Sequence, residues 1–184
     1  MVFLVILTLV VILAGFLIAL YNRLVKLRNT VRSAWADIDV ILKKRYNLVD
    51  NLVETVKGYA AHEKDTLQGV TEARGQAMKA TGPMAKGAAE NMFQQTLKSL
   101  FALSEAYPEL KADQNFLKLQ DQLQEIENNI EYARRYYNAV VRDYNTLTEA
   151  FPSNIIASWF SFHRETFFEL RDSEERKPVK VSFD

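Results

Sequence analysis

The chain has 184 residues, and its 23 Lys and Arg side chains equal its 23 Asp and Glu side chains, so the formal net charge is zero. This length fits one domain, or one domain with an anchor. Because no basic excess provides a field for polyanions, we expect no nucleic-acid partner. The absence of Cys excludes disulfides, thiolate zinc sites and cysteine nucleophiles within this chain.

The first predicted element is a transmembrane anchor over residues 1–21. The run VFLVILTLVVILAGFLIALY after Met1 carries no charge, and as a helix rising about 1.5 Å per residue it spans roughly 30 Å, the thickness of bilayer hydrocarbon. A cleaved signal peptide is the rival interpretation. It requires a basic region before the run and small residues after it, whereas Met1 precedes this run and bulky Leu20 and Tyr21 close it.

Cations directly after the span give the predicted orientation. Tyr21 is expected at the level of the lipid headgroups, and Arg23, Lys26 and Arg28 follow it, so these four residues form the candidate membrane interface. The positive-inside rule then predicts an N-terminus outside and a cytoplasmic bulk, in a chain that crosses the membrane once. A periplasmic bulk is the alternative, in which these cations are only a solvated helix face.

The segment after the anchor is predicted to continue as one long helix. From Leu24 to Ala60, apolar or aromatic residues recur in ten steps over 36 residues, a mean spacing of 3.6 that indicates a straight amphipathic helix. Trp35 and Tyr46 are among the aromatic members of this stripe. Residues 61–80 contain fewer large apolar side chains, so we expect the helix to continue there in a weaker form.

Pro and Gly mark the next boundaries. The stretch TGPMAKG at residues 81–87 predicts a break, with Pro83 in the first turn of a second helix. YPEL at residues 107–110 ends that helix, because a residue before Pro is displaced from helical backbone angles. Asp113 or Asn115 is then the expected N-cap of a further long helix.

A heptad pattern runs along this last long helix. From Phe116 to Phe151, apolar side chains recur at alternating steps of three and four, which predicts a helix-packing seam over about five repeats. Each tyrosine hydroxyl buried in the seam requires a polar partner. A binding or catalytic tyrosine is the alternative interpretation. The seam residues singled out on both long helices are Trp35, Tyr46, Tyr137, Tyr144 and Phe151.

Charge patterning favours helices that lie side by side. Residues 22–46 contain seven basic and two acidic side chains, whereas residues 104–131 contain two basic and seven acidic ones. An antiparallel bundle, or neighbouring subunits, brings such stretches together and favours one register. The predicted fold is therefore all-α: a transmembrane helix continuous with a long amphipathic helix, and an antiparallel bundle of three to four helices over residues 22–151.

The C-terminal part divides into an aromatic-rich segment at residues 152–170 and a loose charged tail at residues 171–184. The segment predicts a short amphipathic helix followed by an extended piece, and its aromatic surface needs cover. We favour cover by the bundle or by a neighbouring subunit, with a lipid interface as the alternative. The candidate subunit or lipid contacts are Trp159, Phe160, Phe162, Phe167 and Phe168.

Patterns of catalytic, cofactor or metal chemistry do not stand out. His62 lacks a second His one turn on, so it does not predict a metal site. Glu127 and Glu131 stand one turn apart, as residues of a solvated acidic face do. The glycines lack phosphate-loop spacing, and no nucleophile elbow frames a serine. We therefore expect no enzyme activity, no cofactor and no metal.

Two extended blocks closely resemble the LemA family. They are YNRLVKLRNTVRSAWADIDVILKKRYNLVDNLVETVKGYAAHE (Tyr21 to Glu63) and LSEAYPELKADQNFLKLQDQLQEIENNIEYARRYYNAVVRDYNTLTEAFPSN (Leu103 to Asn154). The resemblance implies an all-α, membrane-anchored bacterial protein that acts as a scaffold or membrane organiser rather than as an enzyme. Some relatives carry a lipoprotein-type N-terminus with Cys, which this chain does not match.

Two positions depart from the family pattern. Many relatives carry a Pro where this chain has Asp50, so the first helix is expected to be straighter here. Relatives usually carry a Gly-Phe pair where this chain has Ser161 and Phe162.

The features together predict a membrane-anchored helical scaffold that assembles into a homo-oligomer. The alternative is an adaptor that tethers another membrane or envelope protein through the aromatic segment and the tail.

Overall fold

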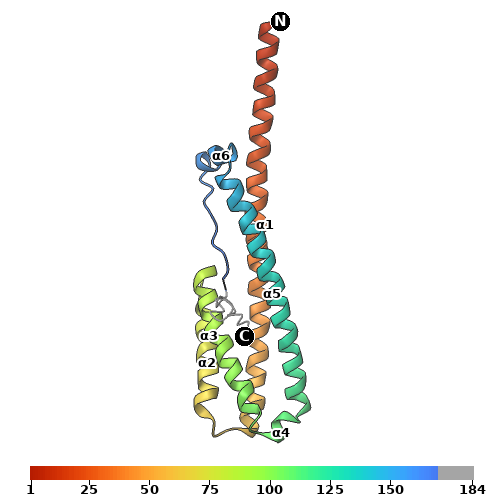
Figure 1. The fold of residues 1–184 in the computed structure, drawn as a ribbon, viewed down its shortest axis with the longest axis vertical. Helices are drawn as coiled ribbons and strands as arrows, with labels where there is room; N and C mark the ends of the chain where they lie inside the picture. The colour runs from red at the N-terminus through yellow and green to blue at the C-terminus, as the bar shows by residue number, and fades with distance from the viewer. Residues whose placement is uncertain (170–184) are drawn as a thin grey trace, which may run out of the picture. The chain divides into compact units, whose positions relative to one another are not determined.

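The structure, a computed structural model, describes residues 1–169 of the chain, and within them it is helical without strands (Figure 1). The predicted all-α class is thereby confirmed, and the apolar N-terminal run continues into the amphipathic helix as predicted. The charged tail expected at residues 171–184 lies outside the described residues. The helices are α1 (Val2–Tyr59), α2 (Lys64–Lys79), α3 (Pro83–Ser104), α4 (Pro108–Lys111), α5 (Gln114–Glu149) and α6 (Ser153–Trp159).

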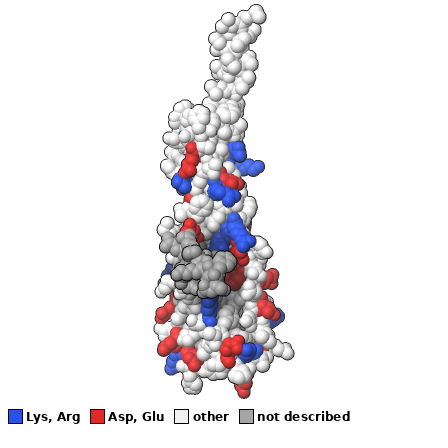
Figure 2. Space-filling model, in the orientation of Figure 1, with Lys and Arg blue, Asp and Glu red and all other residues white. Residues whose placement is uncertain are grey.

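Helix α1 runs unbroken for 58 residues. Its first part is exposed, from Val2 at 74% to Phe16 at 47%, and Figure 2 shows no charged side chain on it. In the part of the chain that the structure describes, α1 is the one helix long and apolar enough to cross a membrane. The helix also passes through Asp50, whose carboxylate forms an ion pair with Arg74 of α2.

The chain forms two compact units. Unit 1 consists of residues 1–39 and 131–167. Unit 2 consists of residues 40–130 and also contains Phe168 and Glu169, the last two described residues. Both α1 and α5 contribute residues to each unit. In unit 2, α2 packs on α3, and ring contacts connect α3 to its other neighbours. Tyr46 of α1 lies 5.8 Å from Phe93, and Phe101 lies 6.4 Å from Phe116 of α5, measured between ring centroids.

The junction between α1 and α2 differs from the expected weak continuation. Helix α1 ends at Tyr59, the chain turns over residues 60–63, and α2 is a separate helix. Ala60 remains 1% exposed at this turn. Helix α2 has an apolar stripe of its own, largely of small side chains, and burying that stripe stabilises a helix that packs back rather than one that extends into solvent. The stripe consists of Leu67, Val70, Ala73 and Ala77.

The predicted starts of the next helices are confirmed. Gly82, with φ of 77°, precedes α3, and Pro83 is its first residue. Oδ1 of Asp113 accepts a hydrogen bond from the backbone N–H of Phe116 at 2.9 Å, which is the N-cap geometry expected for α5. The same bond lowers the pKa of the Asp113 carboxyl. Pro108, however, begins the one-turn helix α4 instead of only ending α3.

Helix α6 ends in a Schellman motif. The N–H of Phe162 donates to the carbonyl of Ala157 at 2.9 Å, and the N–H of Ser161 donates to the carbonyl of Ser158 at 3.3 Å. This motif requires a left-handed residue, and Ser161 has φ of 55°. A glycine adopts this conformation without steric cost, which is a physical reason for the Gly-Phe pair expected in relatives.

Candidate functional site

Unit 2 holds charged side chains where a helical core usually holds apolar ones. Four residues are buried there: Arg45 and Tyr46 of α1, and Lys86 and Glu90 of α3. Together with Glu127 of α5, whose side chain is 32% exposed, they form a group that we call the buried charge cluster. Arg45 is 2% exposed and Glu90 is 1% exposed. Nη1 of Arg45 donates to Oε2 of Glu90 at 2.9 Å. Nε of Arg45 lies 2.8 Å from Oε1 of Glu127, an ion pair too bent for a hydrogen bond.

Further contacts complete the cluster. The hydroxyl of Tyr46 donates to Oε1 of Glu90, and Nζ of Lys86 donates to the carbonyl of Ala77 at 3.0 Å. The Lys86 ammonium also lies 5.9 Å from the centre of the Tyr46 ring. Because α1, α2, α3 and α5 all contribute, these polar contacts link four helices in one core.

Burial has the largest effect on the pKa of Glu90 and on that of Glu127. Burial raises the pKa of Glu90, and this rise is opposed by the hydrogen bond from Tyr46 and by the charges of Arg45 and Lys86. Burial also raises the pKa of Glu127, where Arg45 opposes the rise and Glu90 adds to it. Each oxygen of Glu90 already accepts a hydrogen bond inside the core. The geometry therefore suits a crosslink between helices.

Sequence reasoning missed this cluster, although a signal was present. Arg45 follows Leu42 by three residues and precedes Val49 by four, so helical periodicity puts it on the buried stripe of α1. Its contact with Glu127 joins the basic and acidic stretches that were predicted to lie side by side. Glu127 and Glu131, which were interpreted as one solvated face, instead pair with different arginines, because Glu131 pairs with Arg135.

The candidate membrane interface lies in unit 1, where the end of the apolar run meets the C-terminal aromatic segment. The ring of Tyr21 lies 4.7 Å from that of Phe160 and 5.7 Å from that of Phe162, between centroids. The guanidinium carbon of Arg28 lies 4.7 Å from the centre of the Phe162 ring, at cation–π distance. Tyr21 and Arg28 are therefore partly buried, whereas Arg23 is exposed.

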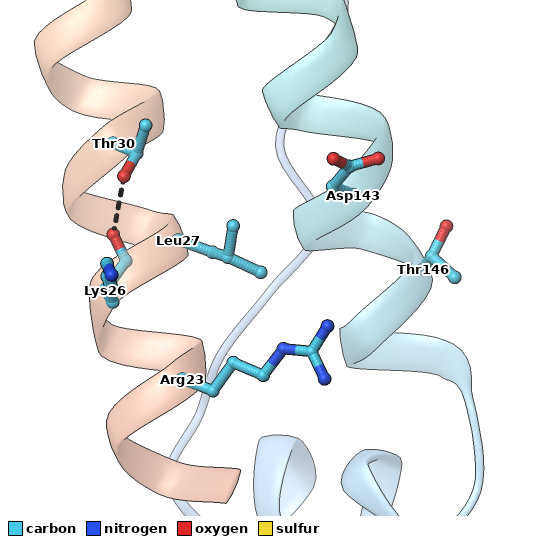
Figure 3. A pocket seen from close by; sticks show the side chains of 6 residues that line it. All are labelled: Arg23, Lys26, Leu27, Thr30, Asp143 and Thr146. Atoms are coloured by element: carbon cyan, nitrogen blue, oxygen red, sulfur yellow. Dashed lines mark hydrogen bonds between the residues drawn. The ribbon is translucent and has the colours of Figure 1, made fainter.

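An open cleft of about 420 Å³ lies beside these residues in unit 1 (Figure 3). Arg23, Lys26 and Thr30 of α1 line one side, and Asp143 and Thr146 of α5 line the other. The hydroxyl of Thr30 donates to the carbonyl of Lys26 at 3.0 Å, so this group is engaged within its own helix. The cleft combines cations with a carboxylate and is open to solvent, which distinguishes it from an enclosed substrate cavity.

The seam tyrosines of unit 1 are buried. Tyr137 is 2% exposed and lies 5.3 Å from Trp35 between ring centroids. Its hydroxyl donates to the carbonyl of Thr166 at 2.9 Å. Burial raises the pKa of Tyr137 to about 12, with a further contribution from Glu165, so the phenol remains a protonated donor at neutral pH. Burial likewise raises the pKa of Tyr144, which is 1% exposed.

Asn145 has a role that sequence reasoning did not assign. Its Nδ2 donates to the carbonyl of Glu165 at 2.9 Å, and its Oδ1 accepts from the N–H of the same residue at 2.8 Å. Together with Tyr137, this amide holds the extended segment that follows α6 against α5.

The remaining seam positions differ from one another. Tyr46 is buried in unit 2 and Trp35 is partly buried in unit 1. Phe151, predicted as the last seam residue, instead follows the end of α5 at Glu149 and is 81% exposed. Pro152 explains the difference, because the residue before a proline is disfavoured in helical geometry and so leaves the heptad register.

The C-terminal aromatic residues divide into buried and exposed ones. Phe162 and Phe168 are buried and Phe167 is partly buried, whereas Trp159 is 73% and Phe160 is 55% exposed.

Glycine at position 87 permits the close approach of Phe168 and Glu169 to α3. A Cβ at Gly87 would lie 2.5 Å from the carbonyl oxygen of Glu169 and 3.6 Å from Cε2 of Phe168. The first distance is a clash with backbone, so Phe168 and Glu169 can pack here only because residue 87 has no side chain.

These observations define an all-helical protein with one apolar N-terminal helix, in which buried charges of the described chain contact other groups of the same chain. The sequence model of the LemA family matches residues 34–183. The chain therefore belongs to the LemA family, and the resemblance predicted from two sequence blocks is confirmed. It is a membrane-associated member of that family, whose apolar α1 fits a membrane anchor.

Several relatives can be compared with this chain. It is 23% identical over 175 residues to the magnetosome proteins MamQ 1 and MamQ 2 of Paramagnetospirillum magneticum, which covers 81% of this chain and 64% of each relative. It is 23% identical over 157 residues to protein LemA of Metamycoplasma hominis, which covers 83% of this chain and 70% of the relative. The chain thus spans less than two thirds of the length of the MamQ relatives.

Proposed function

We propose that this LemA-family chain is a non-enzymatic, membrane-anchored scaffold that self-assembles into a homo-oligomer and organises membrane or envelope components. One contrast carries the proposal. The buried charges are engaged within the core, whereas large aromatic side chains lie outside it. Tyr132 and Tyr136, one turn apart on α5, are 67% and 56% exposed. Exposed aromatic pairs of this kind suit contact with another protein surface, and tyrosine is enriched in such interfaces.

The unbroken α1 supports the same proposal. A helix that leaves the apolar run without a linker transmits the anchor's orientation directly to the residues that pack beyond it. Copies of such a chain, anchored in parallel, are related by rotation about the membrane normal, so cyclic assemblies are the expected form.

Mass photometry of the full chain in detergent tests self-assembly. The wild type is expected to form species heavier than one 21.2 kDa chain with its micelle. Tyr132→Ser combined with Tyr136→Ser is expected to shift the population toward single chains. Gln120→Ser combined with Gln124→Ser alters exposed residues one turn apart on the same helix and is expected to leave the assembly unchanged. A single-chain species for the wild type in every detergent and at every concentration contradicts the proposal.

The same contrast favours an adaptor as the second candidate. Trp159 and Phe160 remain exposed in the C-terminal segment, and a partner that covers them would be another membrane or envelope protein. Because such an adaptor would hold its partner through the tail at residues 171–184 as well as through these aromatic side chains, truncation after Leu170 is expected to release the partner, detected by crosslinking in membranes, while the oligomer persists. Retention of the same crosslinks after truncation argues against any role of the tail.

The proposed orientation places the N-terminus outside and the bulk in the cytoplasm of a bacterial inner membrane. Arg23, Lys26 and Arg28 follow the apolar run on its C-terminal side, and this cationic flank is the part expected to remain inside. A reporter fused to the C-terminus and read on both sides of the membrane checks the orientation. Activity of the reporter only on the outer side supports the periplasmic alternative.

A further inference from the structure

Helix α6 is apolar on two faces. Its inner face, with Ile156 at 3% and Ala157 at 2% exposure, packs within unit 1. Its outer face carries Ile155 at 43% and Trp159 at 73% exposure, four residues apart and so about 40° apart around the helix. Asn154 and Ser158, both exposed and four residues apart, form the polar side of α6. The helix therefore carries an exposed apolar side in addition to its buried one, whereas the exposed surface of an amphipathic helix is usually polar.

Exposed aromatic residues also flank the helix at both ends. Phe151 before α6 is 81% exposed, and Phe160 after it is 55% exposed. The whole stretch FPSNIIASWFSF, residues 151–162, contains no Lys, Arg, Asp or Glu. Large apolar side chains in an uncharged stretch are typical of residues that lie at a lipid interface, whereas the rim of a protein–protein interface usually carries polar and charged residues.

The position of α6 within unit 1 connects this face to the membrane anchor. Phe160 and Phe162 pack on Tyr21, which closes the apolar run of α1 two residues before the first charged side chain, Arg23. Figure 1 shows α6 beside α1 in this part of the chain. Arg23 and Lys26, both exposed, follow within two turns of α1. The apolar outer face of α6 is therefore held at the level where the hydrophobic helix gives way to cations.

We propose that α6 is a second membrane contact, in which Phe151, Ile155, Trp159 and Phe160 insert into the headgroup boundary of the same bilayer that α1 crosses. The occupant of the exposed apolar face is lipid. This inference rests on the membrane anchor of the proposed function and not on self-assembly. The contact gives the anchor two attachment points, which fixes the depth and rotation of α1 more tightly than a lone helix does.

Tryptophan fluorescence in vesicles tests the proposal, because the chain has only Trp35 and Trp159. The full-length Trp35→Phe variant reports Trp159 alone, and the full-length Trp159→Phe variant reports Trp35. Each is reconstituted into phosphatidylcholine vesicles whose acyl chains are brominated either near the headgroup or near the methyl end. Trp35 lies fourteen residues beyond Tyr21, or about 21 Å along α1, so it serves as the matched control.

The expected result is quenching of Trp159 emission by about twofold with bromines near the headgroup, and weaker quenching with bromines near the methyl end, as for interfacial tryptophans. Trp35 is expected to be insensitive to both lipids. Should Trp35→Phe not fold, the emission lost from wild type on Trp159→Phe substitution supplies the same signal.

The alternatives give different outcomes. Trp159 that is unaffected by brominated lipid but accessible to aqueous acrylamide overturns the proposal. Trp159 protected from both quenchers identifies a second copy or another protein as the occupant, and also overturns it. Flotation of vesicles separates these results from failure of the anchor: protein that does not float with the lipid refutes the anchor and this proposal together, whereas floating protein without Trp159 quenching refutes this proposal alone.

Discussion

Substitution of Arg45 by methionine removes the central cation of the buried charge cluster while it preserves much of the side-chain volume. Arg45 is 2% exposed, and the carboxylate of Glu90 that it leaves behind is 1% exposed. Removal of one partner of a buried ion pair costs about 3–5 kcal/mol, because the remaining charge is left uncompensated. Lys86 and Tyr46 still contact Glu90 or its surroundings, so we expect the lower half of this range, about 3 kcal/mol.

The cost should depend on pH in a defined direction. The pKa of Glu90 is raised in the folded chain, so the native state binds this proton more tightly than the unfolded state does. Its contribution to stability is therefore present at low pH and is lost as pH rises through the folded pKa. Loss of Arg45 removes a charge that opposes the rise, so the variant should lose stability more steeply than the wild type as pH rises above the ordinary pKa of a Glu carboxyl.

Far-UV circular dichroism during urea unfolding in detergent measures both effects. Lys44→Met removes the same charge from the neighbouring exposed position and is expected to change the free energy of unfolding by less than about 0.5 kcal/mol. Addition of Glu90→Gln to Arg45→Met removes the stranded charge and should recover part of the loss. If Arg45→Met costs no more than Lys44→Met, or if Glu90→Gln recovers nothing, the cluster does not crosslink the core as described.

The remaining predictions concern the segment that follows α6. Gly87→Ala should destabilise the chain by about 1–3 kcal/mol and expose the docked segment to protease, whereas Gly75→Ala, with nothing within 4 Å of its new Cβ, should stabilise it by about 0.5–1 kcal/mol in thermal unfolding. Ser161→Gly should raise the thermal midpoint, through a gain of about 1 kcal/mol from relief of the left-handed serine; a lowered midpoint contradicts this reasoning. Asn145→Asp should speed amide exchange over residues 162–169, with exposed Asn47→Asp as the unaffected control.

Helix existence was predictable because periodicity is a property of neighbouring residues. The stripe from Leu24 to Ala60 and the cap at Asp113 required only local spacing and the chemistry of one carboxylate. The turn after Tyr59 was less accessible. It lacks Pro, and residues 61–80 are compatible with helix, so only the burial gained by folding α2 back distinguishes a turn from a continuation.

The pairing within the buried charge cluster could not be predicted from the sequence. Arg45 and Glu90 are 45 residues apart, and no local pattern reports that the two apolar stripes they interrupt face each other. Each residue read alone is a charged side chain on a helix, which is usually solvated. The informative feature was the charged residue within an apolar stripe. A charge that is buried at such a position needs a partner of opposite charge.

Tyr-Asn occurs four times in the chain, at residues 21–22, 46–47, 137–138 and 144–145. These pairs illustrate how one motif acquires different roles from its surroundings. A helix interior has no free backbone groups with which to bind an extended segment, since its N–H and C=O groups already bond within the helix. A side-chain amide offers the donor and acceptor that a neighbouring strand would otherwise present. Asn145, 4% exposed, uses both on Glu165, whereas Asn47 follows an equally buried tyrosine but is itself exposed. The heptad predicts that Tyr137 and Tyr144 share one helix face. The contact of Asn145 depends instead on the segment after α6, which the heptad does not describe.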